Sequence, residues 1–150
     1  MLKYFSLKRL IHYCFLSMSH LPMRGHHRWL FLKLGGVKFA HKKVQCFVYK
    51  GVSIDTVAPE LVTIGNGVTL TEGTKILTHF IISSKPGRNF RMGKVVIEDD
   101  VFIGMNTIIC NSVTIGKGAL IGAGSIVTKD IPPYQVWAGN PAKFVKERAR

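Results

Sequence analysis

A period of six runs through the hydrophobic positions of the chain from Ile64 onward. Isoleucine, leucine or valine recurs at every sixth residue, in two separate frames. One frame holds Ile64, Leu70, Ile76 and Ile82, and the other holds Ile97, Ile103, Ile109, Ile115, Ile121 and Val127. A period of six fits neither the 3.6-residue turn of a helix nor the alternation of a half-buried strand. The pattern therefore predicts a parallel β-helix of hexapeptide repeats.

The residues between these positions support the same fold. Glycine follows the aliphatic residue directly at Gly65, Gly104, Gly116 and Gly122, where it permits positive φ or a close backbone approach at a corner. The fifth place of each hexad holds a small or β-branched residue that fits inside a narrow prism: Val68, Thr74, Val101, Thr107, Val113, Ala119 and Ser125. Three hexads then form one triangular coil, and coils stack at the spacing of neighbouring strands, ~4.8 Å.

The two frames are out of register with each other, because Ile97 follows Ile76 by 21 positions, which is not a multiple of six. The break falls in residues 83–96, which contain a proline, two glycines and four basic residues, and we predict a loop insertion there. Loops on a rigid scaffold commonly carry function. The chain is thus predicted to consist of an N-terminal helical extension (1–36), the β-helix with its insertion (37–131) and a C-terminal capping segment (132–150).

The N-terminal extension is basic and apolar, and Pro22 and Gly25 divide it into two predicted helices. Its stretch from Leu10 to Leu21 resembles the apolar core of a signal peptide, but polar residues interrupt it and no small-residue cleavage site follows, so we expect it to be retained. Packing on the main domain is the favoured interpretation. The alternative is an amphipathic segment on anionic lipid, with Trp29 and Phe31 as interfacial anchors.

Charge and cysteine content indicate the kind of partner and the cellular compartment. The 21 Lys and Arg outnumber the 8 Asp and Glu, giving a formal net charge of +13 and a field that attracts anions. The three cysteines form no CxxC pair, which argues against a disulfide framework and a thiolate zinc site and favours a reducing cytosol. No nucleic-acid-binding module is apparent.

Four motifs resemble the hexapeptide acyltransferase family, and in particular its galactoside, maltose and polysaccharide O-acetyltransferases. They are TKILTH at 74–79, VVIEDDVFIG at 95–104, VTIGKGALIGAGSIVTKDIPP at 113–133 and WAGNPAKFVKE at 137–147. The resemblance implies an all-β, left-handed parallel β-helix, an exception to the right-handed crossover rule. It also implies acetyl-CoA as co-substrate and a homotrimer with donor sites between subunits, and no metal is expected. We expect the protein in the cytoplasm, or at the inner face of the membrane if the N-terminal extension binds lipid.

His79 is the only histidine in the repeat region and matches the position of the family's catalytic histidine. A neutral imidazole can accept the proton of an acceptor hydroxyl or amine as it attacks the thioester. A carboxylate usually orients such a histidine, and the nearest acidic candidates are Asp55 and Glu72. We favour Asp55, which precedes the repeat by about one coil, although a turn aspartate before Pro59 is an equal alternative.

The resemblance also implies a set of donor contacts along a groove between prisms. Phe102, where some relatives have tryptophan, would lie beside the thioester arm, and the backbone amide of Met105 would face the developing oxyanion. The remaining implied contacts are Ala123 and Thr128 to pantetheine, and Lys129 and Lys143 to the phosphates.

The leading functional prediction is transfer of an acetyl group from acetyl-CoA to a hydroxyl of a sugar or polysaccharide precursor. N-acetylation of a nucleotide sugar, an antibiotic or an amino acid is the enzymatic alternative. A β-helical zinc carbonic anhydrase would need three imidazoles on one metal, which this chain could supply only on a symmetry axis. The non-enzymatic alternative is a basic β-helical module that binds a membrane or nucleic acid.

Overall fold

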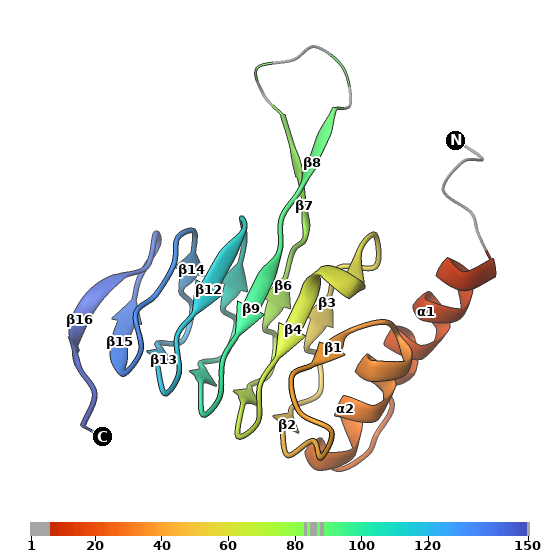
Figure 1. The fold of residues 1–150 in the computed structure, drawn as a ribbon, viewed down its shortest axis with the longest axis horizontal. Coiled ribbons are helices and arrows are strands. Elements are labelled where there is room, and N and C mark those ends of the chain that lie inside the picture. The colour runs from red at the N-terminus through yellow and green to blue at the C-terminus, as the bar shows by residue number, and fades with distance from the viewer. Residues whose placement is uncertain (1–6, 83, 85–86, 88, 150) are drawn as a thin grey trace.

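Three parallel sheets form the faces of a prism, and the chain visits the faces in turn (Figure 1). The computed structural model describes residues 7–82, 84, 87 and 89–149. The first face consists of β1 (Lys38–Phe39), β4 (Val62–Ile64), β9 (Val95–Ile97) and β12 (Val113–Ile115). The second face holds β2 (Phe47–Val48), β5 (Thr69–Leu70), β10 (Phe102–Ile103), β13 (Leu120–Ile121), β15 (Gln135–Ala138) and β16 (Lys143–Glu147). The third face holds β3 (Ser53–Ile54), β6 (Lys75–Ile76), β11 (Ile108–Ile109) and β14 (Ile126–Val127).

The hydrophobic period lines the inside of this prism. Ile64 pairs with Ile97 on the first face, and Leu70 pairs with Ile103 on the second, so equivalent residues of successive coils stack directly. All residues of both frames except Ile82 are at most 1% exposed. Full burial of each such side chain contributes roughly 1.5–3 kcal/mol. These columns of aliphatic side chains form the core and hold the coils together.

Glycines in the second place of the hexad are required by close approach rather than by positive φ. A Cβ atom added to Gly104 would lie 2.5 Å from the backbone nitrogen of Ala123 on the next coil. Positive φ falls two residues later instead, as at Asn106 with φ 56°. Each corner therefore has one position closed to side chains and another that favours glycine or asparagine.

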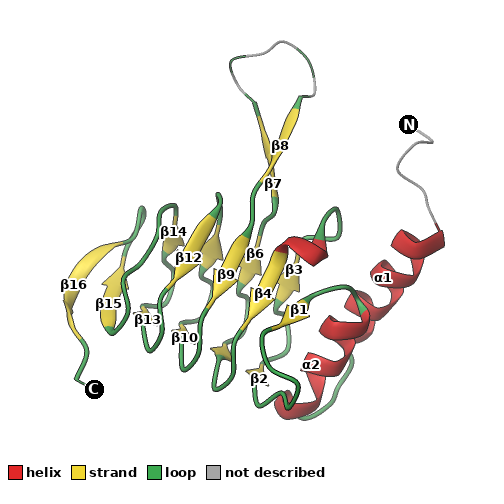
Figure 2. Cartoon of the chain, viewed as in Figure 1, coloured by secondary structure: helices red, strands yellow, loops and turns green. Residues whose placement is uncertain are grey.

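An antiparallel hairpin of β7 (His79–Ile81) and β8 (Phe90–Met92) projects from the corner between the third and first faces (Figure 2). It joins the two hydrophobic frames, because the chain leaves the prism after Ile76 and returns to it in β9. The hairpin lies closer to the N-terminus than the predicted insertion at 83–96, because Val95 and Val96 already pair in the first face. Residues 83, 85, 86 and 88 lie outside the described part.

Ile82 continues the six-residue frame in the sequence but does not line the prism. The residue follows β7 in the hairpin, where its backbone amide donates to the carbonyl of Asn89 at 2.7 Å. The coil thus leaves the prism after Ile76, before the sixth position is reached. A count of six along the sequence cannot reveal this departure.

The coil continues beyond Ile131 before the chain folds back. Strand β15 pairs in parallel with β13, and Trp137 stacks on Ile121, so residues 135–138 extend the second face. Strand β16 then returns antiparallel to β15. The indole of Trp137 is mostly buried and covers this end of the core.

Two helices, α1 (Leu7–Met18) and α2 (Gly25–Leu34), lie at the N-terminal end of the prism (Figure 1). Helix α2 packs against β2, and α1 packs against α2. A short 3₁₀ helix, η2 (Pro59–Leu61), leads into β4. In the described part of the chain, neither helix has the length and hydropathy to cross a bilayer. Residues 1–6 of the predicted N-terminal extension are outside that part.

Candidate active site

His79 and Asp55 meet at the corner between the third and first faces. Asp55 directly follows β3, and β3 pairs with β6, so Asp55 lies one coil before the point where the chain turns into the hairpin. The Asp55 carboxylate accepts hydrogen bonds from the backbone amides of Thr78 at 2.9 Å and of His79 at 3.1 Å. The same Oδ2 oxygen lies 2.5 Å from Nδ1 of His79. The pair is therefore fixed by backbone as well as by side-chain contacts.

The two side chains differ in their access to solvent. The Asp55 side chain is 4% exposed and that of His79 is 33% exposed, so the carboxylate lies behind the imidazole. A carboxylate that accepts from Nδ1–H selects the tautomer whose Nε2 carries a lone pair. The His79 ring also packs edge-to-face on Phe90, with 5.4 Å between ring centroids. The imidazole is thus partly exposed, is oriented by Asp55 and Phe90, and can accept a proton.

Opposing effects act on the pKa of Asp55. Burial raises the pKa, but hydrogen bonds from the backbone amides of Val57 and Thr78 and from the His79 side chain outweigh burial, and the pKa lies below the ordinary value of 3.8. The carboxylate is therefore ionised throughout the neutral range.

Replacement of Asp55 by asparagine is expected to weaken the acid dependence of stability. A carboxylate whose folded-state pKa is lowered stabilises the fold above pH 3.8 and loses this contribution as the pH falls through the folded-state value. The free energy of unfolding of Asp55→Asn should therefore be lower than that of wild type at neutral pH. It should also decrease less than that of wild type when the pH is lowered from neutral to below 3.8. Chemical unfolding at a series of pH values measures this difference.

Asp100→Asn, at a side chain that is 62% exposed, is the matched control. Parallel acid limbs for wild type and Asp55→Asn would contradict the assignment.

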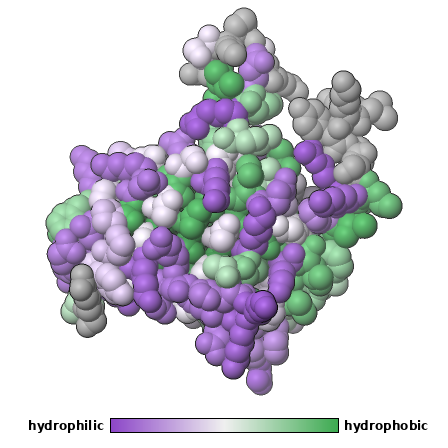
Figure 3. All heavy atoms as spheres, in the orientation of Figure 1, coloured by the Kyte–Doolittle hydropathy of each residue, from purple (hydrophilic) through white to green (hydrophobic). Residues whose placement is uncertain are grey.

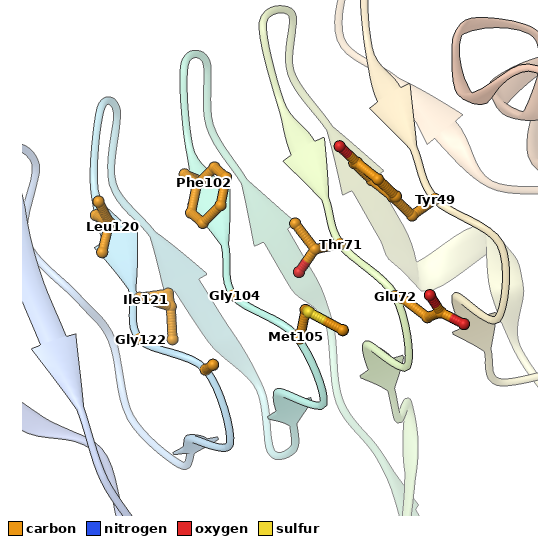
Figure 4. Close-up of a pocket in the computed structure, with 10 residues that line it drawn as sticks. Tyr49, Thr71, Glu72, Phe102, Gly104, Met105, Leu120, Ile121 and Gly122 are labelled. Atoms are coloured by element: carbon orange, nitrogen blue, oxygen red, sulfur yellow. The ribbon is translucent and has the colours of Figure 1, made fainter.

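A second feature is an apolar groove of about 460 Å³ on the second face and its corner toward the third (Figure 4). Tyr49, Phe102 and Leu120 come from different coils along it, and Phe102 and Met105 are exposed. Its other lining residues are Thr71, Glu72, Gly104, Ile121, Gly122 and Ala123.

The predicted donor contacts divide between two corners of the prism. Phe102, Met105 and Ala123 line the groove. Thr128 and Lys129 follow β14, at the same corner as His79 but on a later coil. The ammonium of Lys129 lies 5.1 Å from the ring centre of Trp137.

Lys143 begins β16 and is exposed. Glu72, the alternative partner for the histidine, lines the groove, whereas Asp55 contacts His79. Within one chain, the groove and the histidine therefore occupy different corners.

Three residues near these features were not foreseen from the sequence: Tyr49, Phe90 and Thr78. Tyr49 belongs to the irregular first coil, and Phe90 reaches His79 through hairpin pairing, so neither position follows from a count of six. The Thr78 hydroxyl is buried and finds no hydrogen-bond partner among the described residues. The described residues also contain no group of three His, Cys, Asp or Glu side chains arranged to hold a metal ion.

Comparisons with known proteins bear on this fold and site. The family model described as bacterial transferase hexapeptide (six repeats) matches residues 94–129. "Putative acetyltransferase YvoF" of Bacillus subtilis (strain 168) is 32% identical over 126 residues, which are 84% of this chain and 69% of YvoF. The structure of a galactoside acetyltransferase in complex with coenzyme A aligns with a TM-score of 0.72 and 25% identity, covering 95% of this chain and 81% of that one.

A shorter match is a 2,3,4,5-tetrahydropyridine-2,6-dicarboxylate N-acetyltransferase of Staphylococcus aureus (strain JH9). It is 55% identical over 53 residues, which are 35% of this chain and 22% of that enzyme. Parallel sheets built on a six-residue period, together with these matches, define a hexapeptide-repeat transferase. The chain belongs to the hexapeptide-repeat acetyltransferase family, which confirms the resemblance drawn from its motifs.

Proposed function

We propose that this protein transfers an acetyl group from acetyl-CoA to a hydroxyl of a sugar or polysaccharide precursor. The observation that carries the proposal is the His79–Asp55 pair, a half-exposed imidazole oriented by a buried carboxylate beside an exposed hairpin. The galactoside acetyltransferase bound to coenzyme A supports both the donor and the sugar acceptor. In this proposal, the prism winds left-handed, as the family resemblance implies.

The proposed reaction uses His79 as a general base. Nε2 accepts the proton of the acceptor hydroxyl while the hydroxyl oxygen forms a bond to the thioester carbonyl carbon. The carbon–sulfur bond then breaks, and the coenzyme A thiolate takes the proton from the imidazolium. Asp55 holds the ring and stabilises its charged form. Acetyl ester and free thiol are the products, and no covalent enzyme intermediate is required.

In this scheme, the groove holds the pantetheine arm. Phe102 and Ala123 flank the arm, and the backbone amide of Met105 donates to the developing oxyanion. Thr128 contacts pantetheine, while Lys129 and Lys143 meet the phosphates of the adenosine end. Because the groove and His79 lie on different corners of one prism, a complete site combines one copy's groove with a neighbour's histidine. We therefore propose a homotrimer, in which all three such sites are equivalent.

The protein is assigned to the cytoplasm, where acetyl-CoA is available and free thiols persist. Cys14, Cys46 and Cys110 are all unpaired in the structure. We also propose that the three segments of the chain act as one unit: the basic extension, the prism with its insertion and the terminal segment. Residues 132–150 would cap the C-terminal end of the prism.

Filling the groove should weaken donor binding. Wild type is expected to bind acetyl-CoA in a calorimetric titration, and Ala123→Phe should weaken that binding by more than about tenfold, because the added ring occupies the space beside Phe102 and Met105. The exposed Ala40 lies outside the groove, and Ala40→Phe is the matched control. Failure of wild type to bind acetyl-CoA would overturn the proposed function. Equal affinities of Ala123→Phe and Ala40→Phe for acetyl-CoA would show that the groove is not the donor site.

Amine acetylation is the second candidate, and the 55% identity to an N-acetyltransferase favours it. Thiol release from acetyl-CoA, measured against matched panels of sugar and amine acceptors, separates the two. The product gives an independent check, because alkaline hydroxylamine cleaves an acetyl ester and leaves an amide intact. A hydroxylamine-resistant product would assign the enzyme to amines.

A further inference from the structure

Helix α1 presents its apolar side away from the protein. Leu16 is the buried residue of this helix, and at 100° per residue Leu7, Leu10 and Ile11 lie on the opposite side. Leu7 is 74% exposed, and Leu10, Ile11 and Met18 are exposed as well. An amphipathic helix in a globular protein normally turns this stripe inward. The stripe of α1 is therefore left for another surface.

Helix α2 buries Leu32 but also leaves leucine side chains on its outer side. Its buried side includes Arg28, whose guanidinium donates to the backbone carbonyls of Ser19, Leu21 and Val48 at 3.1 to 3.3 Å. Leu30 and Leu34, on the outer side of the helix, are each 45% exposed. The Arg28 contacts join the connection between the helices to β2, and thereby fix which side of the helical pair faces outward.

The chain contains only basic charged residues up to the end of β3. The first 54 residues contain ten Lys and Arg and no Asp or Glu, since Asp55 is the first acidic residue of the chain. Lys8 is exposed beside the apolar stripe of α1, and Lys33 is exposed on α2. Hydrophobic side chains gather over the helical end of the molecule, next to a band of hydrophilic ones (Figure 3). An apolar stripe flanked by bases is complementary to a negatively charged amphiphile.

We propose that the outward stripe of α1, formed by Leu7, Leu10, Ile11 and Met18, docks on the surface of an anionic lipid bilayer. A 12-residue helix is about 18 Å long, against roughly 30 Å for the hydrocarbon core, so α1 lies in the interface and does not span it. A second copy docked through the same stripe is a poorer occupant, because it would bring the bases beside the stripe, such as the exposed Lys8, against their own counterparts. This inference does not depend on the proposed acetyltransferase reaction.

Vesicle sedimentation with the full chain tests the proposal. Wild type is expected to bind phosphatidylcholine vesicles that contain phosphatidylglycerol, and to bind pure phosphatidylcholine vesicles much more weakly. The double variant Leu10→Gln/Ile11→Gln should lose about tenfold or more in vesicle affinity, because both side chains would enter the headgroup boundary. Lys8→Gln should lose about fivefold, and added salt should weaken wild-type binding.

Val145→Gln is the matched control, because Val145 is an exposed aliphatic residue at the other end of the prism. It should bind vesicles as wild type does. Equal binding of the double variant and wild type, or equal binding to neutral and anionic vesicles, would overturn the proposal. So would a change in molecular mass of the double variant by light scattering with unchanged vesicle binding, which would assign the stripe to contacts between copies. An acetyl-CoA titration on the same variants separates this result from the fate of the proposed enzyme.

Discussion

His79→Ala is expected to lower the rate of acetyl transfer by about two to four orders of magnitude, the usual contribution of a positioned general base. The affinity for acetyl-CoA should stay within about twofold of wild type, because the substitution leaves all the groove-lining residues unchanged and removes a group that acts in the chemical step. Thiol release gives the rate, and calorimetric titration gives the donor affinity. A loss of turnover with retained donor binding would identify His79 as part of the chemistry rather than of donor binding.

The chain supplies a matched control for this substitution. His41 also contacts a carboxylate, with Nε2 lying 2.9 Å from Oδ1 of Asp99, but this pair lies away from both the groove and the hairpin. His41→Ala removes an equivalent histidine–aspartate contact and should leave acetyl transfer unchanged. Retention of wild-type turnover by His79→Ala would exclude the proposed base. Equal losses in both variants would instead point to a general effect on folding, which thermal unfolding of the two proteins would reveal.

The sequence predicts the interior of the prism well, because one geometric constraint repeats. The first place of each hexad must be aliphatic and every coil must return to the same place, so the positions from Ile97 to Val127 follow from counting. The constraint ends where the chain leaves the prism. The stacking of Ile64 on Ile97 depends on the hairpin of β7 and β8, and hydrophobic periodicity does not encode the length of the chain between Ile76 and Ile97.

The candidate site lies where this periodicity is weakest. Asp55 was favoured as the partner of His79 from its distance of about one coil, and the pairing of Ile54 with Ile76 places it there. Phe90 could not be placed in the same way, because its approach to His79 depends on the register of the hairpin. The composition of α1 likewise predicts an apolar face. It does not specify whether that face turns inward, which is decided by tertiary contacts such as those of Arg28.

Truncation inside the prism is expected to cost far more stability than truncation on the hairpin. Ile103 is fully buried and stacks between Leu70 and Ile121 on the second face. Ile103→Ala should lower the free energy of unfolding by about 2–5 kcal/mol, since removing the side chain leaves a cavity. Backbone hydrogen bonds fix the spacing between this coil and its neighbours, so the cavity cannot close. One of them runs from the amide of Phe102 to the carbonyl of Ala119 at 3.0 Å.

Ile81→Ala is the matched control, because it deletes the same atoms from a side chain that is 62% exposed on the hairpin. It should change the free energy of unfolding by less than about 0.5 kcal/mol. Chemical unfolding followed by circular dichroism, at one protein concentration because assembly would shift the midpoint, measures both variants. Similar costs for the two substitutions would mean that the stacked aliphatic columns do not carry the stability of the fold. A large cost confined to Ile103 would show that the same period of six that predicts the fold also marks the residues that stabilise it.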